Sequence, residues 1–178
     1  GALFGFSRIP FDATFPVSEG PLGLKAAVER LATEAESAVR GGADILVVDD
    51  ADVSAERAPV PSLLAVGAIH HRLIESSLRS LTSIVSVADD ARDVHHVAAL
   101  LGYGADAICP RLALQTVGAE ADASDDESAI SPEAQSRFEA AIEAGVLKVL
   151  SKMGISTVDS YRGAQIFEVI GLGAEVVD

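Results

Sequence analysis

Hydrophobic and polar positions along this chain follow two alternating patterns, one typical of helices and one typical of buried strands. Apolar residues recur every three or four positions at Leu24, Val28, Leu31, Ala35 and Val39, which predicts an amphipathic helix. Short apolar runs bounded by turn residues predict strands. The predicted helices are 22–40, 62–78, 90–101, 131–144 and 157–170, and the predicted strands are 7–15, 44–48, 83–87, 105–109, 146–150 and 175–177.

One short motif repeats between these elements. Gly42-Ala43-Asp44 recurs as Gly104-Ala105-Asp106 and, more loosely, as Gly173-Ala174-Glu175, each time between a helical pattern and an apolar run. The motif predicts a helix that ends at a left-handed glycine, a tight turn and a buried strand. Repeated βα units predict an α/β fold, a parallel β-sheet with flanking helices and right-handed crossovers. Either a partial barrel or a Rossmann-like open sheet satisfies this pattern.

Length and composition fit one α/β domain over residues 1–178. A chain of this size buries roughly 70% of the surface that its unfolded form exposes. Hydrophobic residues make up 49% of the chain and aromatic residues only 4%, so the core is aliphatic. The acidic run at 118–131 has no apolar period, which predicts a mobile surface loop. Pro59 and Pro61 predict a second loop over 52–61.

Charge and cysteine content exclude several classes of function. A formal net charge of −14 disfavours nucleic acids and anionic membranes as partners, because both require basic residues. One cysteine, Cys109, cannot form an internal disulfide or hold an iron–sulfur cluster. No apolar run is long enough to span a membrane and no signal peptide is recognisable, so we expect a cytoplasmic protein.

The turn after the predicted strand 146–150 is the first candidate site. It combines Ser151, Lys152, Met153, Gly154 and Ser156 in six residues. At the start of a helix such a turn can hold an anion, since free N–H groups and the helix dipole favour negative charge. Ser156 followed by Asp159 also fits a helix cap, so structure or a contact with another domain is the favoured interpretation.

Other candidates have a plain structural interpretation beside the functional one. His70-His71 and His95-His96 are adjacent pairs that point about 100° apart on a helix, so neither pair grips one metal, and we expect packing roles. Cys109 is expected to be a small buried hydrophobe. Five aspartates follow the ends of strands, where they can form a metal or acid–base site, although helix capping is favoured. These aspartates are Asp12, Asp49, Asp50, Asp89 and Asp90.

Several stretches, in order along nearly the whole chain, resemble one family. The most specific is Leu147-Lys148-Val149-Leu150-Ser151-Lys152-Met153-Gly154-Ile155-Ser156-Thr157, and it is followed by Ser160-Tyr161-Arg162-Gly163-Ala164-Gln165. The others are 12–16, 61–71, 94–96, 101–110 and 166–172. Together they resemble the central domain of the large subunit of glutamate synthase. One departure is Arg111, which stands where the family usually has an aromatic residue.

The resemblance implies that the chain is the C-terminal portion of this domain and a structural segment that forms part of an ammonia channel. Glutamate synthase converts glutamine, 2-oxoglutarate and a reductant to two glutamates, using FMN and an iron–sulfur cluster. The implied partners are the amidotransferase domain and the FMN-binding domain. No cofactor is expected in this chain, which lacks the catalytic cysteine and the flavin and iron–sulfur residues, so it is not expected to be catalytic alone.

The resemblance also changes the interpretation of the first candidate site. Its residues are then expected to face neighbouring domains or to contact an anion: Ser151, Lys152, Met153, Gly154, Ser156, Tyr161, Arg162 and Gln165. Two alternatives stay open, a stand-alone α/β module that binds an anion or a flavin phosphate, and a plain interaction module. Apolar surface that partner domains normally cover can also drive self-association.

Overall fold

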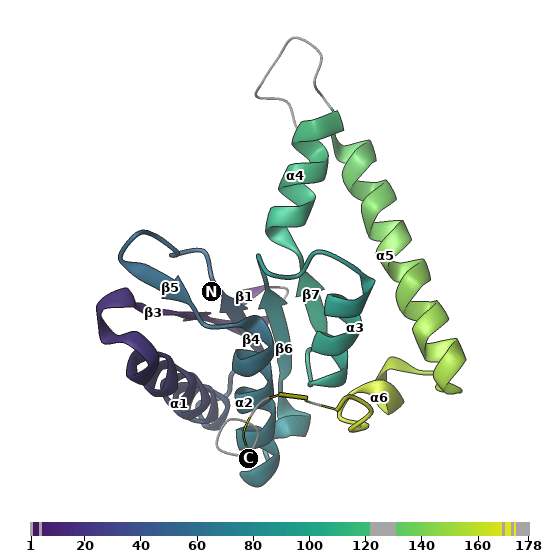
Figure 1. Cartoon of the computed structure of the whole chain (residues 1–178). Helices are drawn as coiled ribbons and strands as arrows, with labels where there is room; N and C mark the ends of the chain where they lie inside the picture. Colours follow the sequence, from purple (N-terminus) through teal and green to yellow (C-terminus); the bar gives the residue numbers. More distant parts are fainter. Residues whose placement is uncertain (1, 4, 122–130, 169, 172, 174–178) are drawn as a thin grey trace.

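Four parallel strands lie side by side in the order in which they occur along the chain. A computed structural model describes residues 2–3, 5–121, 131–168, 170–171 and 173 (Figure 1). The parallel strands are β2 (Phe6–Asp12), β4 (Ile45–Asp49), β6 (Ser83–Val87) and β7 (Ala107–Cys109), and β1 (Ala2–Leu3) pairs antiparallel with β2 at one edge. The parallel sheet predicted from the sequence is therefore confirmed.

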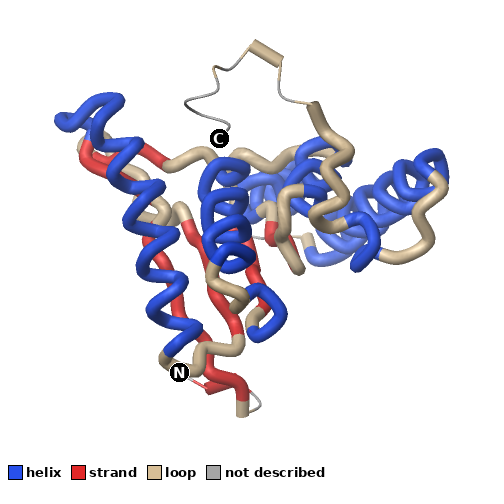
Figure 2. The backbone as a smooth tube through the Cα atoms, turned by 90° about the horizontal axis from the view of Figure 1, so that it is seen from below, coloured by secondary structure: helices blue, strands red, loops and turns tan. Residues whose placement is uncertain are grey.

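Each parallel strand leads into a helix, although short elements intervene. The helices are α1 (Gly20–Arg40), α2 (Ser62–Glu75), α3 (Val94–Gly102), α4 (Arg111–Ala121), α5 (Pro132–Met153) and α6 (Val158–Tyr161), with 3₁₀ turns at Val17–Glu19 and Arg79–Leu81. Figures 1 and 2 both place α1 at one side of the strands and α5 at the other. No helix in the described ranges is long and apolar enough to cross a membrane.

The sequential strand order decides between the two architectures that the sequence left open. A Rossmann-like sheet reverses its strand order so that helices cover both faces. Here the main apolar core joins α1 and α2 to one face of the sheet, through Leu31, Ile69, Leu46, Val48 and Ile84. A singly wound sheet with its helices on one side is the arrangement of a partial barrel.

Two copies of the Gly-Ala-Asp motif form the predicted turns. Gly42 and Gly104 have φ angles of +89° and +116°, which residues with a side chain rarely adopt. The backbone N–H of Ala43 donates to Ala38, and that of Ala105 donates to Leu100, so both turns close the preceding helix. The third copy, with the strand predicted at 175–177, lies outside the described residues.

Alanine substitutions at these two glycines are expected to differ in cost. Each introduces left-handed strain of about 1–2 kcal/mol. At Gly42 a Cβ atom meets open space, whereas at Gly104 it would lie 2.3 Å from Cγ of the buried His70. Overpacking of this kind costs about 1–3 kcal/mol, so Gly104→Ala should destabilise more than Gly42→Ala by that amount in urea unfolding. Equal losses would show that the His70 ring moves freely.

The N-terminal strand differs from its prediction. The run predicted as one strand over 7–15 divides into β2 and β3 (Thr14–Pro16) at Ala13, because the Asp12 carboxylate accepts from both the backbone N–H and the hydroxyl of Thr14. β3 pairs with β5 (Arg57–Pro59), so the predicted loop over 52–61 contains a short strand. Helix α4 was not predicted and includes the first residues of the acidic run; residues 122–130 are not described.

Helix α5 contains the largest correction. The sequence predicts a helix end at Gly145 and a strand over 146–150, but α5 continues to Met153 and ends at Gly154, whose φ is +70°. Gly145 is instead a close packing position, because a Cβ atom there would lie 2.3 Å from a methyl group of Val94 on α3. Val146 and Leu150, four residues apart, face α3 as one helical stripe.

The predicted helix over 157–170 is wrong beyond its first turn. Among the described residues of this range only Val158–Tyr161 is helical, and its N-cap is Thr157 rather than Ser156: the Thr157 hydroxyl accepts from the N–H of Ser160. Left-handed residues at Gly163 and Gln165 then turn the chain away from a helix. This segment closes a second apolar cluster, in which Tyr161 packs with Val97, Leu101, Val146 and Leu150.

Candidate functional site

The five aspartates that follow the ends of the predicted strands lie at one edge of the sheet, its carboxyl end. Asp12 and Asp49 end neighbouring strands in the same register. The Asp90 carboxylate accepts from the backbone N–H of Ser62, at the start of α2, at 3.0 Å. Asp90 therefore caps a helix as expected, but a helix distant in sequence. The N-cap of α3 is Asp93, which accepts from the N–H of His96.

Arg111 occupies the centre of this edge. Its guanidinium donates to Asp49 at 2.7 Å, to Asp50 at 2.8 Å and to Asp89 at 2.7 and 3.0 Å. The carboxylates of Asp89 and Asp49 raise the pKa of Arg111, which stays charged. The residue that the sequence marks only as a departure from the family pattern is thus the one that joins the ends of β4, β6 and β7.

The ion pairs leave the aspartates little capacity for other chemistry. Asp50 is buried, and its burial raises the pKa of that carboxyl group. Its second oxygen already accepts from the N–H of Asp89. Asp12 is held in the same way by Arg57, at 2.5 Å. The described residues contain no group of three or more His, Cys, Asp or Glu placed to hold a metal ion. We call this edge, with its ion pairs from Arg111 and Arg57, the arginine-clamped rim.

A second charged cluster lies at the amino edge of the sheet. Asp106 accepts from the Arg79 guanidinium at 2.7 Å and from the backbone N–H of Ile84 at 2.7 Å, and it also pairs with Arg162. The Nε–H of Arg79 donates to Nδ1 of His70 at 2.9 Å. Burial lowers the pKa of both arginines. The cluster fastens the C-terminal segment to the sheet through Arg162.

His70 makes this cluster sensitive to pH. Burial, and then the charge of Arg79, lower its pKa from 6.5 to about 4. The unfolded chain therefore binds more protons between pH 6.5 and 4, so the stabilisation is complete above 6.5 and is lost as the pH falls toward 4. At 1.36 kcal/mol per pKa unit the loss reaches up to about 3 kcal/mol.

A pair of variants isolates the contribution of His70. His70→Asn keeps an acceptor near the position of Nδ1 but does not titrate, so its free energy of unfolding should vary less between pH 6.5 and 4 than that of the parent chain. His71→Asn, at the exposed neighbour, should retain most of the variation, because His71 lowers the pKa of His70 less than burial and Arg79 do. Urea unfolding at several pH values measures both. Parallel curves for His70→Asn and the unchanged chain would contradict the assignment.

The predicted domain-contact residues fall into two groups. Ser151, Lys152 and Met153 form the last turn of α5, and with Gly154 and Ser156 they are exposed. Gln165 is also exposed. Tyr161 is fully buried, and Arg162 pairs with Asp106 and Asp159. The long helix that would have offered an anion its dipole is a single turn. Contact of the exposed group with a neighbouring domain stays a prediction.

Of the remaining candidates only His70 is buried, whereas His71, His95 and His96 are exposed. His70 and His71 contact each other edge to face, and the ring of His95 packs on Phe167 at 6.1 Å between centroids. Cys109 lies half-buried at the end of β7, where burial raises the pKa of its thiol. A raised pKa keeps the thiol protonated and unreactive. The predicted packing role is therefore confirmed for His70, and Cys109 is less buried than expected.

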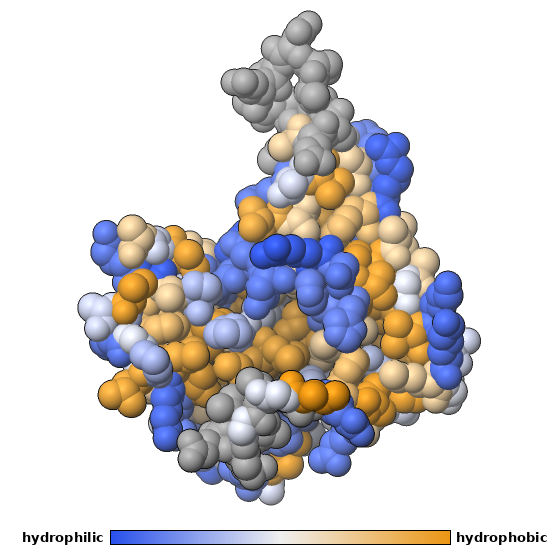
Figure 3. Space-filling view, viewed as in Figure 1, coloured by the Kyte–Doolittle hydropathy of each residue, from blue (hydrophilic) through white to orange (hydrophobic). Residues whose placement is uncertain are grey.

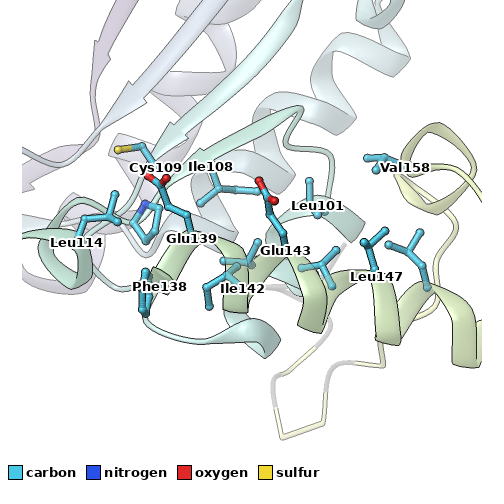
Figure 4. A pocket seen from close by; sticks show the side chains of 14 residues that line it. Leu101, Ile108, Cys109, Leu114, Phe138, Glu139, Ile142, Glu143, Leu147 and Val158 are labelled. Atoms are coloured by element: carbon cyan, nitrogen blue, oxygen red, sulfur yellow. The ribbon is translucent and has the colours of Figure 1, made fainter. Parts of the chain in front are cut away.

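An apolar pocket of about 660 Å³, which we call the α5 pocket, lies between α5 and the ends of α3 and β7. Figure 4 shows side chains from α5, among them Ile142 and Leu147, opposite Leu101 and Ile108. Apolar side chains also gather on the surface over this region in Figure 3. Two of the residues that line the pocket, Leu147 and Val158, are also exposed. The pocket was not predicted from the sequence. It forms because residues 146–150 belong to helix α5, whereas the sequence predicted a strand there.

Fold and site together define a singly wound βα domain without a catalytic constellation among its described residues. Comparison with known protein families identifies the family to which this domain belongs. The family model described as "Glutamate synthase central domain" matches residues 4–173. The chain belongs to the glutamate synthase central domain family, which confirms the resemblance found in the sequence.

The chain is similar to relatives whose names give three different electron donors, NADH, NADPH and ferredoxin. It is 47% identical over 168 residues to glutamate synthase [NADH] of Schizosaccharomyces pombe, covering 94% of this chain and 8% of that protein. The glutamate synthase [NADPH] large chain of Bacillus subtilis is 46% identical over 155 residues, covering 87% and 10%. The ferredoxin-dependent enzyme of Pyropia yezoensis is 42% identical over 183 residues, covering 97% and 12%. The chain thus spans about a tenth of these relatives.

A solved structure supports the partial barrel. A mutant flavocytochrome b2 with pyruvate bound superposes with a TM-score of 0.56 at 12% identity, covering 91% of this chain and 50% of that chain. At this identity the likeness concerns the fold alone. It agrees with a sheet that is one half of an α/β barrel.

Proposed function

We propose that this chain is a structural segment of a glutamate synthase, that it lines part of the route taken by ammonia, and that it is not catalytic alone. The observation that carries the proposal is the family match over residues 4–173, within relatives of which the chain forms only about a tenth. The whole enzyme converts glutamine, 2-oxoglutarate and a reductant to glutamate, and its FMN and iron–sulfur cluster belong outside this chain.

The α5 pocket is the part of the chain best suited to ammonia. Its walls are mostly aliphatic, with Leu101, Ile108, Ile142 and Val146 among them. An apolar environment disfavours a charged group and so lowers the pKa of an ammonium ion. The aliphatic walls therefore favour neutral ammonia, whereas the exposed carboxylates of Glu139 and Glu143, which also line the pocket, favour ammonium at its rim. The arginine-clamped rim supports a structural role, since its carboxylates are already paired.

Filling the pocket in the full-length parent enzyme tests the proposal. Ile142→Trp should lower glutamate formation from glutamine, while glutamine hydrolysis continues and ammonia is released. Ala141→Trp places the same side chain on the exposed side of α5 and should leave the two reactions coupled. Coupling that survives Ile142→Trp in a folded enzyme would exclude this pocket from the route.

The chain alone provides a separate test against the stand-alone alternatives. The purified 178-residue protein should show no glutaminase or glutamate synthase turnover. It should also show no absorption near 450 nm after incubation with FMN and removal of free flavin. Turnover would contradict the structural role, and a retained flavin spectrum would support the flavin-phosphate alternative.

A further inference from the structure

One face of the parallel sheet contributes to neither apolar core. Side chains alternate along each strand, and the set that includes Leu46 and Ile84 is buried beneath the helices. The other set is half-buried or exposed and belongs to neither apolar cluster of the described residues. We call the apolar residues at the centre of this set the open face: Pro10, Ile45, Val47, Val85, Val87 and Ala107. Around them the same set includes Phe6, Arg8, Asp12, Asp49, Ser83 and Cys109.

Parallel sheets normally have both faces covered. In a closed barrel this face points inward, and layers of branched side chains from the remaining strands fill the space. The open face has the same composition, mainly Val and Ile. The superposed flavoprotein is also about twice as long as this chain, because the match covers only 50% of it. Its fold therefore includes further elements beyond those that match this chain.

We infer that the open face is an interdomain contact covered by a mainly aliphatic surface of the same parent polypeptide, outside residues 1–178. This inference rests on the proposed function, because it requires a parent enzyme. It adds to that function a specific surface and the chemistry of the partner. The relatives extend far beyond the matched region, with about nine tenths of their length outside it.

The partner packs onto the face rather than continuing the sheet past β2. Pro10 has no N–H to donate to a further strand. The antiparallel β1 already pairs with residues 6 and 7 of the same strand. The carboxylates at the end of the face, Asp12 and Asp49, are paired with Arg57 and Arg111, so they do not require a basic partner.

A second copy of the chain fits the open face less well. Two copies would bring together net charges of −14 each, and like charges oppose association. A segment of the parent polypeptide has no such constraint and is held at a high effective concentration by its covalent connection. The two occupants predict different cross-links.

Site-specific photocrosslinking in the full-length parent enzyme tests the inference. A photoreactive phenylalanine derivative replaces Val47 at the centre of the open face, or Ala107 near the β7 edge in case the first replacement disturbs folding. We expect intramolecular cross-links that peptide mapping places outside the segment of residues 1–178. The same residue at Glu34, on the exposed side of α1, is the matched control and should give fewer such cross-links.

The other outcomes contradict the inference. Cross-links that join two copies of residues 1–178 would show that self-association covers the face. If the enzyme is folded and active but neither position gives cross-links, the face is exposed to water. In either case an enzyme that still couples glutamine hydrolysis to glutamate formation leaves the proposed function intact, so the two proposals fail separately.

Discussion

Asp106→Asn is expected to lower the free energy of unfolding by about 3–5 kcal/mol, the usual cost of removing one partner from a buried ion pair. The side chains of Asp106 and Arg79 are 19% and 15% exposed. Asp106 is the shared acceptor for two guanidinium groups and one backbone N–H. Asparagine keeps its shape but removes the charge, so two partly buried cations lose their common counterion. Urea unfolding at pH 7 measures the loss.

Asp159→Asn is the matched control, because Asp159 also pairs with Arg162. Its side chain is 87% exposed, and ion pairs in water contribute less than about 1 kcal/mol. A small loss for Asp159→Asn beside a large one for Asp106→Asn would show that burial of the acceptor decides the energy. Similar small losses for both would mean that the cluster is hydrated and that the C-terminal segment is held by apolar contacts.

The parts of the fold that could be predicted are those whose signals are local. Strand β6 was predicted with both of its bounds, since a short run with Ile84, Val85 and Val87 ends at Ala88-Asp89-Asp90. The turns at Gly42 and Gly104 could be predicted because the left-handed conformation they require is a property of the glycine itself. The helical N-cap at Ser131 has the same local character: its hydroxyl accepts from the N–H of Ala134.

The errors arise where the cause lies far away along the chain. Gly145 has the same appearance as a C-cap, and only the approach of Val94, about fifty positions earlier, explains it as a packing position. Arg111 bonds to Asp49 across 62 positions, so no spacing rule connects them. The α5 pocket was missed for the same reason, because its walls come from helices whose contact is not encoded locally.

The same difference between local signals and distant contacts decides which functional conclusions could be drawn from the sequence. The family could be predicted because its motifs are contiguous in sequence, and the comparisons confirm it. The surfaces that would serve the parent enzyme depend on packing between distant elements. The stretch 147–157 illustrates the difference: it identifies the family, yet only its placement on α5 and beyond shows that Leu147 and Leu150 line the α5 pocket and that Leu150 also packs in the cluster with α3.

Tyr161→Ala is expected to lower the free energy of unfolding by about 3–5 kcal/mol, as is typical when a large buried aromatic side chain is truncated. Tyr161 has no exposed surface, and its ring packs edge to face on Phe167 with centroids 6.3 Å apart. It fills the space between α3, α5 and the C-terminal segment. Its loss should therefore release this segment, which limited proteolysis near Gly163 would detect.

Tyr161→Phe separates the ring from the hydroxyl. Among the described residues the buried hydroxyl has no hydrogen-bond partner, and a buried group of this kind costs about 1–3 kcal/mol. Tyr161→Phe should therefore leave stability unchanged or raise it, while Tyr161→Ala destabilises. If phenylalanine lowers stability by more than about 1 kcal/mol, the hydroxyl has a partner, and the residue holds the C-terminal segment by a polar contact as well as by packing.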